Sequence, residues 1–438
     1  MTPRQVAGLV VVVTVATLGA LYYYGADDLL EEESAPPAPR AEAPSAPPST
    51  PPAAAAWSSA NIRELLPVAP TRAGSVSRPV PALPDYDRAL ATLSAVVERY
   101  AGDPENPWAI MHGVLARGPE FRLADERVGL AHVFAAYAEP RLFGSLNLLS
   151  FPKTRNGKPV EPHTDLVLKN MTEVGVLPEA SFPVGAGVAT AADLYRATLL
   201  KTWIRMAENK LSFDGFNDMP WGLQALAAWA PSEDLRWVAE DGTSMDMDIF
   251  TDFTVAVLHK ESKFMFQSMA AGQDFERKGQ PLFSYACGGA HLVQGASFAV
   301  ARGFGRPESR KAVTAQAALL FYRLPIELRI YDDTMKKMRQ HREKLLVQRM
   351  KFLGHWLETM SKLEILGFFT PDDIQAATIE GAAQNLVITV RAIEDEGLLA
   401  DMTALRTRDE QLYLDLVGDS AHAIRGLELA LGRQSLKW

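Results

Sequence analysis

The sequence predicts an all-α protein, in which one transmembrane helix and a disordered linker precede a large domain of about six helical hairpins. Three observations predict this organisation. Residues 6–24 form an almost uncharged apolar run, residues 26–84 are acidic and then rich in proline and alanine, and beyond Asp85 apolar residues recur at three- and four-residue spacing. With 47% hydrophobic and 9% aromatic residues, the chain can bury a sizeable core within residues 85–438.

The first segment, residues 1–25, has the features of a membrane anchor. A helix that crosses a bilayer needs about twenty mostly apolar residues, and residues 6–24 supply them. Arg4 precedes the run and a cluster of acidic residues follows it, so we expect a cytoplasmic N-terminus and a periplasmic or extracellular C-terminal domain. The run is longer than a usual signal-peptide core and no clear small-x-small site precedes Asp27, so we expect no cleavage.

The second segment, residues 26–84, lacks the apolar side chains of a folded domain. Eight prolines between Pro36 and Pro52 favour an extended spacer that holds the domain away from the membrane. A short apolar patch from Ile62 to Val68 is expected to dock either on the domain or on the membrane.

Charge and cysteine content exclude several classes of protein. A formal net charge of -9 disfavours nucleic acid as a partner, because such binding depends on Lys and Arg at the phosphates. The single cysteine, Cys287, excludes an intramolecular disulfide and a cysteine-rich zinc module. One thiolate could still join histidines around a metal ion.

The third segment, residues 85–438, shows one helical pattern after another, separated by Gly or Pro. No run of alternating residues predicts a strand. Twelve helices are expected, which make six hairpins, with starts near Asp87, Asn106, Ala124, Pro162, Ala191, Asp218, Met245, Gly289, Glu308, Arg342, Asp372 and Arg408.

Similar short patterns recur on alternate predicted helices. Each contains a histidine or tryptophan, and successive markers are 51, 58, 70, 64 and 67 residues apart. One helical hairpin with its loops fits each step, as in arrays of repeated supersecondary units. The markers are His112, His163, Trp221, His291, His355 and His422.

With this helix count and repeat spacing, residues 85–438 resemble the α/α-toroid superfamily. Its members are barrels of paired helices and include terpenoid cyclases, protein prenyltransferase β subunits and several polysaccharide-degrading enzymes. The resemblance implies a central cavity lined by an inner ring of helices, with ligands entering at one mouth. It does not define the chemistry, because one fold hosts many functions.

The repeated histidines are the candidate catalytic residues. Imidazole changes protonation near neutral pH, so it suits acid/base chemistry and metal binding. Glu358 follows His355 by three residues and could orient that imidazole or supply an acid beside it. Alternatively, the histidines cap helices or join neighbouring hairpins, and Glu358 belongs to a surface pair. The candidates are His112, His163, His291, His355 and Glu358.

Cys287, His291 and His355 form a candidate metal site, with zinc as the expected ion. Three ligands of this kind with one open position are typical of catalytic zinc. Toroid prenyltransferases are similar in taking Cys and His ligands from different inner helices, but Tyr285 stands where their acidic ligand would precede the cysteine. The alternative is an inert buried cysteine beside a structural histidine.

These features favour a membrane-anchored envelope enzyme that cleaves a cell-surface glycan or other polymer by acid/base or metal-assisted chemistry. Two alternatives stay open: a non-catalytic envelope scaffold or binding module, and a zinc-dependent enzyme like the prenyltransferases or cyclases. The hypothesis of a site makes a geometric prediction. In a ring of hairpins the marker histidines should converge, with Cys287, His291 and His355 within about 5 Å of one point.

Overall fold

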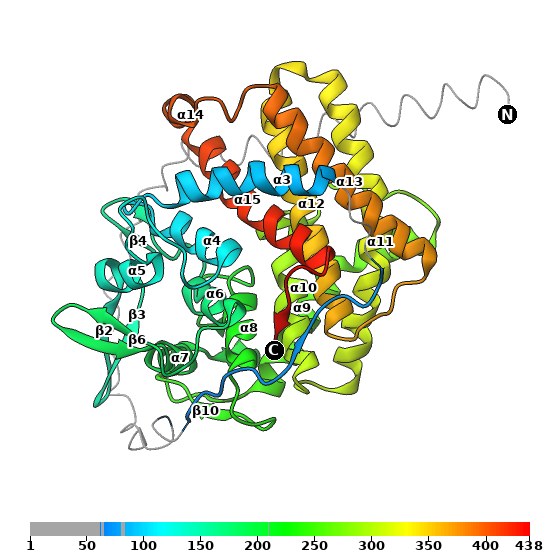
Figure 1. The fold of residues 1–438 in the computed structure, drawn as a ribbon. Coiled ribbons are helices and arrows are strands. Elements are labelled where there is room, and N and C mark those ends of the chain that lie inside the picture. Colours follow the sequence, from blue (N-terminus) through cyan, green and yellow to red (C-terminus); the bar gives the residue numbers. More distant parts are fainter. Residues whose placement is uncertain (1–61, 63–64, 80–83, 209) are drawn as a thin grey trace, which may run out of the picture.

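The computed structural model of the protein describes residue 62 and residues 65–79, 84–208 and 210–438 (Figure 1). The predicted anchor, residues 6–24, and most of the predicted linker lie outside the described residues. In the part of the chain that is described, no helix combines the length and the apolar character that a bilayer crossing requires.

The described residues are mostly helical, with 61% helix in 13 helices and a few short strands, which agrees with the predicted all-α class. Each of the twelve predicted helices has a counterpart. The largest difference in a start is that between the expected Ala124 and the observed Gly129. One short helix, α14 (Met402–Arg408), was not expected.

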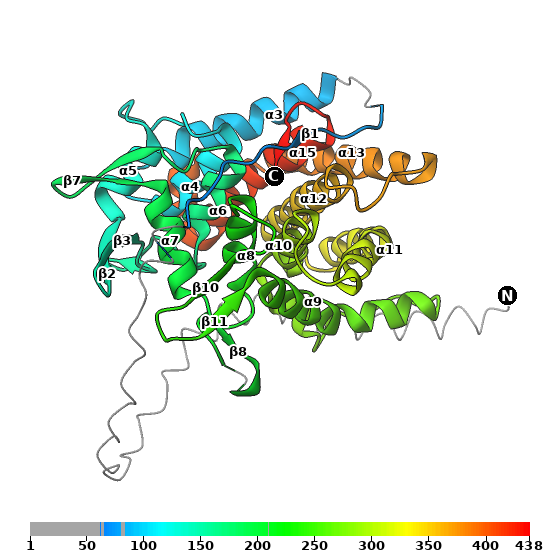
Figure 2. The ribbon, with the colours of Figure 1, turned by 90° about the horizontal axis from the view of Figure 1, so that it is seen from below.

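Six helices contact one another in a closed cycle. Each contacts the next, and the last contacts the first. In Figure 2 they lie at the centre of the domain. In chain order they are α4 (Pro107–Arg117), α6 (Leu166–Val174), α8 (Met219–Ala228), α10 (Ala290–Ala301), α12 (Arg342–Ile365) and α15 (Glu410–Ala430).

Six further helices alternate with these along the chain and surround them (Figure 2). Every one of them contacts at least one member of the central set, so each pairs as an outer helix with an inner one. They are α3 (Pro84–Val96), α5 (Gly129–Tyr137), α7 (Ala191–Lys201), α9 (Met247–Ala270), α11 (Pro307–Lys337) and α13 (Asp373–Asp395).

Local signals in the sequence explain where these helices begin. The Asn106 side chain accepts a hydrogen bond from the Ala109 amide, and Pro107 occupies the first turn of α4, where no amide donor is needed. Asp372 and Gln375 form a reciprocal capping box at the start of α13. The Asp246 side chain accepts a hydrogen bond from the Ile249 amide at the start of α9.

Glycine permits the closest approach between the inner helices α12 and α15. A Cβ atom on Gly426 would collide with the carbonyl oxygen of Gly354, and one on Gly354 would lie 2.9 Å from the backbone of Ala423. Atoms essentially never approach so closely, so these positions exclude larger residues. Both glycines keep the ring narrow on this side.

Short pairs of antiparallel strands interrupt the helical pattern, contrary to the expectation of no strands. The longest pairs β2 (Glu139–Phe143) with β3 (Leu146–Ser150), and a turn at Gly144 with φ 58° joins them. Strands of two to five residues are too short to give a clear alternating pattern. The other pairs are β1 (Ala73–Gly74) with β12 (Leu436–Lys437), β4 (Thr154–Arg155) with β5 (Lys158–Pro159), β6 (Ser181–Val184) with β7 (Gly187–Thr190), β8 (Ile204–Arg205) with β9 (Lys210–Leu211), and β10 (Arg236–Val238) with β11 (Ser244–Asp246).

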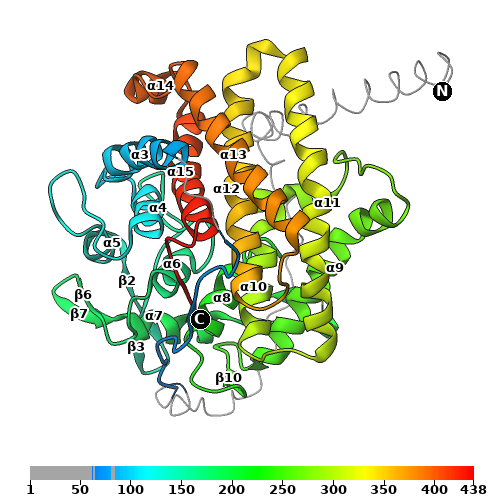
Figure 3. The same cartoon turned by 45° about the vertical axis from the view of Figure 1, so that its right-hand side comes forward.

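Residues 65–79, which the sequence assigned to the linker, lie against the helical domain (Figure 3). The Val68 amide donates to the Trp229 carbonyl at 3.0 Å, and Arg72 exchanges backbone hydrogen bonds with Trp438. Arg78 forms a buried ion pair with Glu364. The folded unit therefore begins before Asp85. Of the apolar patch, Ile62 is buried and Leu65 packs against the core, whereas the side chains of Leu66 and Val68 are exposed.

Candidate active site

A cavity of about 280 Å³ lies inside the ring of inner helices. The predicted convergence of the repeat markers is confirmed, because all six side chains line this one cavity although they come from six different hairpins. His422 lies in the middle of α15, so this marker does not cap a helix. The lining markers are His112, His163, Trp221, His291, His355 and His422.

Four of the histidines form a compact cluster. The ring centres of His291 and His355 are 5.1 Å apart, and those of His291 and His422 are 5.5 Å apart. His422 also lies 3.9 Å from His355 and 5.4 Å from His112. Two imidazoles that bind one zinc ion tetrahedrally have ring centres roughly 5 Å apart, so the first two spacings suit shared ligation.

The turn Ala286–Gly289 places Cys287 beside this cluster. Cys287, Gly288 and Gly289 all have positive φ values, 53°, 59° and 83°. Glycine adopts this conformation freely, whereas a cysteine there is strained. Helix α10 begins only at Ala290, so Cys287 belongs to the loop and not to the inner helix.

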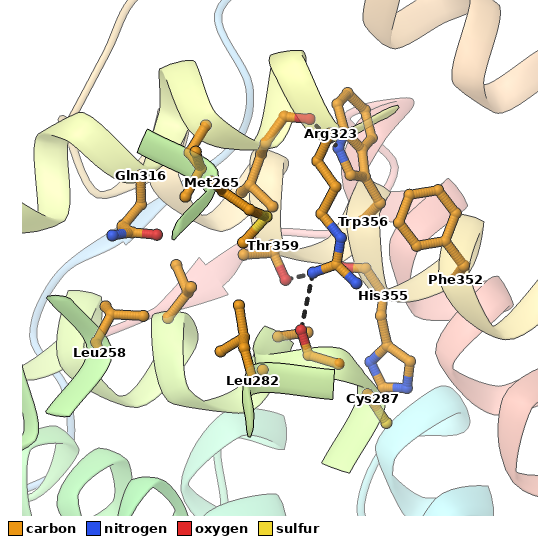
Figure 4. Close-up of a pocket in the computed structure, with 16 residues that line it drawn as sticks. Leu258, Met265, Leu282, Cys287, Gln316, Arg323, Phe352, His355, Trp356 and Thr359 are labelled. Carbon is orange, nitrogen blue, oxygen red and sulfur yellow. Dashed lines mark hydrogen bonds between the residues drawn. The ribbon is translucent and has the colours of Figure 1, made fainter. Parts of the chain in front are cut away.

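The ligand atoms of Cys287, His291 and His355 all lie within 4.8 Å of one another, as the geometric prediction requires. Figure 4 shows the Cys287 sulfur beside the His355 ring. Among the described residues, neither ring nitrogen of His355 has a hydrogen-bond partner, and Nδ1 of His291 has none, although both side chains are buried. A buried polar atom without a partner is costly, so these nitrogens fit a metal ion.

Burial sets the protonation of these three groups. It lowers the pKa of His291 and of His355 well below the ordinary value, and the neighbouring histidines lower it further. Both imidazoles are therefore neutral and keep a lone pair. Burial raises the pKa of the Cys287 thiol to about 12, so the thiol stays protonated unless a nearby cation favours the thiolate.

Glu358 is neither part of a surface pair nor a free acid. It is fully buried, and its Oε2 accepts a hydrogen bond from Nδ1 of His422 at 2.9 Å, while Nδ1 of His355 lies 3.7 Å away. Burial raises the pKa of Glu358, but Lys362 and His422 outweigh that effect and hold the pKa well below its ordinary value. The ionised carboxylate thus fixes the His422 tautomer and leaves Nε2 of His422 unprotonated.

An ion network beneath the histidines connects the inner helices. Lys362 lies 2.6 Å from Glu358 and 2.5 Å from Glu173, and Lys169 lies 2.7 Å from Glu173. Gln294 accepts a hydrogen bond from Lys362 at 2.8 Å. All of these side chains are buried, so the network closes the floor of the cavity with paired charges.

His163 occupies a more exposed position in the cavity wall. Its ring stacks on Trp221 with centres 4.3 Å apart, and Trp221 lies 4.5 Å from the His291 ring. Asp218 accepts a hydrogen bond from Nδ1 of His163 at 3.3 Å. Burial raises the pKa of Asp218, but His163 and Lys153 outweigh it and lower that pKa below its ordinary value, so an ionised Asp218 leaves Nε2 of His163 free.

His112 and Asp419 complete the polar lining. Nδ1 of His112 donates to the Trp108 carbonyl at 2.8 Å, and burial lowers the His112 pKa to about 3, so this imidazole is neutral. Burial raises the pKa of Asp419 to about 8, and its Oδ2 has no hydrogen-bond partner among the described residues. Asp419 lies 3.9 Å from Lys351.

Sequence reasoning missed several of these side chains. Asp415 and Asp419 precede the marker His422 at helical spacing on one face of α15, and this pattern was a usable signal. Lys169 with Glu173, and Glu358 with Lys362, are ion pairs of residues four apart, which occur on many exposed helices. Nothing in the local sequence distinguishes the buried pairs from exposed ones.

The cavity is therefore lined by side chains that could bind a metal ion, by an imidazole that hydrogen-bonds to a carboxylate, and by two tryptophan rings. This set can hold a cation, move a proton and contact an amphipathic ligand. No protein-family model matches the chain, and neither a curated protein nor a solved structure matches it.

Proposed function

We propose that residues 65–438 form an α/α toroid and that this protein is an envelope enzyme with a site for metal-assisted hydrolysis. The toroid is supported by the alternation of inner and outer helices and by the contact of α15 with α4. The location is supported by the sequence alone, through the apolar run at residues 6–24 and the charges on either side of it.

The observation that carries the proposal is the set of possible metal ligands beside the N-terminal end of α10. Cys287, His291 and His355 bring one sulfur and two neutral imidazoles within 4.8 Å of one another at a cavity wall. Sulfur and imidazole are the ligands that zinc prefers, and three of them leave one position open. A zinc ion held there would supply Lewis acidity at a position facing the cavity.

His163 is proposed as the residue that moves the proton. Asp218 fixes its Nδ1–H, so Nε2 can accept a proton from a reacting group and later return it. Trp221 contacts both imidazoles, with ring centres 4.3 Å from His163 and 4.5 Å from His291, so the proton carrier and a metal ligand border the same aromatic side chain in one cavity. Glu358 acts indirectly by orienting His422.

A glycan or similar envelope polymer is the proposed substrate. Trp108 and Trp221 contribute aromatic side chains to the cavity lining, and Asn170 and Asn217 contribute amide groups, a combination that suits hydroxyl-rich rings. The volume of about 280 Å³ suits a chain end of one or two sugar units.

A non-catalytic scaffold is the second candidate, and the buried ion network favours it. Lys362 contacts Glu173 on α6 and Gln294 on α10, so one side chain of α12 joins three hairpins. In that role the histidines would only stabilise the ring.

Metal content and hydrolysis together test the proposal. The full-length chain, purified in detergent, should contain one zinc ion and should release soluble fragments from isolated envelope polysaccharide. His291→Gln should lose both properties, and Cys287→Ser should lose hydrolysis and bind zinc more weakly through the two histidines, whereas His132→Gln, on α5 outside the cavity, should keep both. A folded wild-type chain with neither zinc nor hydrolysis would leave the scaffold as the better account.

The proposed location has its own test. A reporter fused after Trp438 should be active only outside the cytoplasm, because the basic side of the anchor stays inside. Reporter activity in the cytoplasm would overturn the topology without affecting the site.

A further inference from the structure

The turn that presents Cys287 has a conformation that its own sequence does not favour. Cys287 has φ 53° and ψ 34°, a left-handed conformation that is costly for a residue with a Cβ atom. Such strain persists only where surrounding contacts hold it, and it concentrates at functional sites.

Two side chains hold this turn by its backbone, one from the loop before α8 and one from α11. The Asn217 side chain accepts a hydrogen bond from the Ala286 amide at 2.8 Å. On the other side of Cys287, Nη1 of Arg323 donates to the Gly288 carbonyl at 2.8 Å. Figure 4 shows the Arg323 guanidinium extending from its helix toward the turn.

Arg323 is itself fixed by buried charges. Its Nε donates to Glu327 at 2.9 Å, and the other carboxylate oxygen of Glu327 accepts from Arg277 at 2.8 Å. All three side chains are buried, and the Arg323 guanidinium also lies over the rings of Phe283 and Phe352. These contacts therefore fix the orientation of the Arg323 guanidinium toward the Gly288 carbonyl.

Neighbouring side chains do not fill all the space around the turn, so packing alone does not fix its conformation. A small cavity of about 30 Å³ adjoins it, and Cys287, Gly288, Arg323 and His355 all line that cavity. The turn thus has space into which it can relax if the hydrogen bond from Arg323 is lost. Relaxation would move the Cys287 sulfur relative to His355.

We infer that Arg323 is a positioning residue for the metal centre, because its hydrogen bond to Gly288 holds the Cys287 thiol toward His291 and His355. This inference rests on the proposed metal centre. Glu327 and Arg277 support it by fixing the guanidinium. The role concerns the sulfur ligand, so the two histidines should still bind metal when Arg323 is replaced.

Cobalt substitution of the full-length chain tests the inference, because a thiolate ligand gives cobalt a near-ultraviolet charge-transfer band that histidines do not. Arg323→Met should lose most of this band and weaken zinc binding by about 10- to 100-fold, the usual effect of removing a group that orients a ligand. Arg323→Lys should restore part of both. Arg349→Met is the matched control, since Arg349 is equally buried but bonds to Asn385, and it should behave as wild type.

A second variant covers the case in which Arg323→Met does not fold. A Cβ on Gly288 would lie 2.6 Å from Nη2 of Arg323, so Gly288→Ala should displace the guanidinium and reduce the same band. Folded variants with wild-type zinc affinity and an unchanged band would refute the positioning role while the metal centre stands. A wild-type chain that binds no cobalt or zinc would instead refute the metal centre, and the positioning role with it.

Discussion

The Glu173 carboxylate forms ion pairs with the buried lysines beneath the cavity. We predict that Glu173→Gln lowers the free energy of unfolding by about 3–5 kcal/mol. The buried carboxylate lies 2.7 Å from Lys169 and 2.5 Å from Lys362. Glutamine keeps the volume but removes the charge, so Lys169 loses its ion pair with Glu173 and Lys362 keeps only its pair with Glu358. An uncompensated buried charge costs far more than the loss of a neutral hydrogen bond.

The pH dependence of this effect follows from the pKa of the carboxylate. Burial raises the pKa of Glu173, but Lys169, Lys362 and Arg425 outweigh burial and lower the pKa to about 2. An unfolded glutamate has a pKa of about 4.3. The stabilisation is therefore complete above that value and is lost as the pH falls toward 2, so wild type and variant should converge on acidification.

The loss in free energy of unfolding is measured by urea denaturation followed by circular dichroism, because urea, unlike a salt, does not screen the ion pairs. Glu240→Gln is the control, because its pair with Arg141 is solvent-exposed, and it should cost about 0–1 kcal/mol. The double variant Glu173→Gln with Lys169→Met removes the anion together with the cation that pairs with it, leaves Lys362 paired with Glu358, and should be more stable than Glu173→Gln alone. A cost below 1 kcal/mol for Glu173→Gln, or a double variant less stable than the single one, would refute the electrostatic reasoning.

Three further predictions concern packing, pH and metal binding. Gly426→Ala should destabilise the ring by about 1–3 kcal/mol through overpacking, whereas Gly381→Ala, where nothing lies near the new Cβ, should stabilise it by about 0.5–1 kcal/mol in the same denaturation assay. Because burial raises the pKa of Asp419 to about 8, the wild type should lose stability as the pH rises from about 4 to 8, and Asp419→Asn should flatten this slope in a pH series of unfolding measurements. Glu358→Gln should weaken zinc binding about 10- to 100-fold in a chelator competition, because it removes a buried negative charge 3.7 Å from Nδ1 of the proposed ligand His355, and an unchanged affinity would count against this role.

The helices and the convergence of the histidines could be predicted from the sequence, because the signals for both are local. Caps such as Asn106 and Asp372 lie within one turn of the contacts they make, so the sequence places helix starts well. A residue that recurs once per hairpin must point toward the shared axis of a ring. His291 and His355 therefore approach each other although 64 residues separate them.

The partners of these groups were not predictable, because they depend on contacts across the ring. Glu358 binds His422, 64 residues away, in addition to its helical neighbour His355. Arg323 is one of many basic residues along its part of the sequence, and only the fold aims it at Gly288. Residues 65–79 dock mainly through backbone hydrogen bonds and one ion pair, which apolar periodicity cannot detect.

X-ray absorption spectroscopy of the zinc-loaded full-length chain tests the central claim most directly. The donor set Cys287, His291 and His355 predicts one sulfur at about 2.3 Å and two imidazole nitrogens at about 2.0–2.1 Å from zinc, with a lighter atom in the open position. Cys287→Ser should remove the sulfur signal and keep the imidazoles. A chain that takes up no zinc, or zinc surrounded by oxygen and nitrogen without sulfur, would contradict the proposed centre.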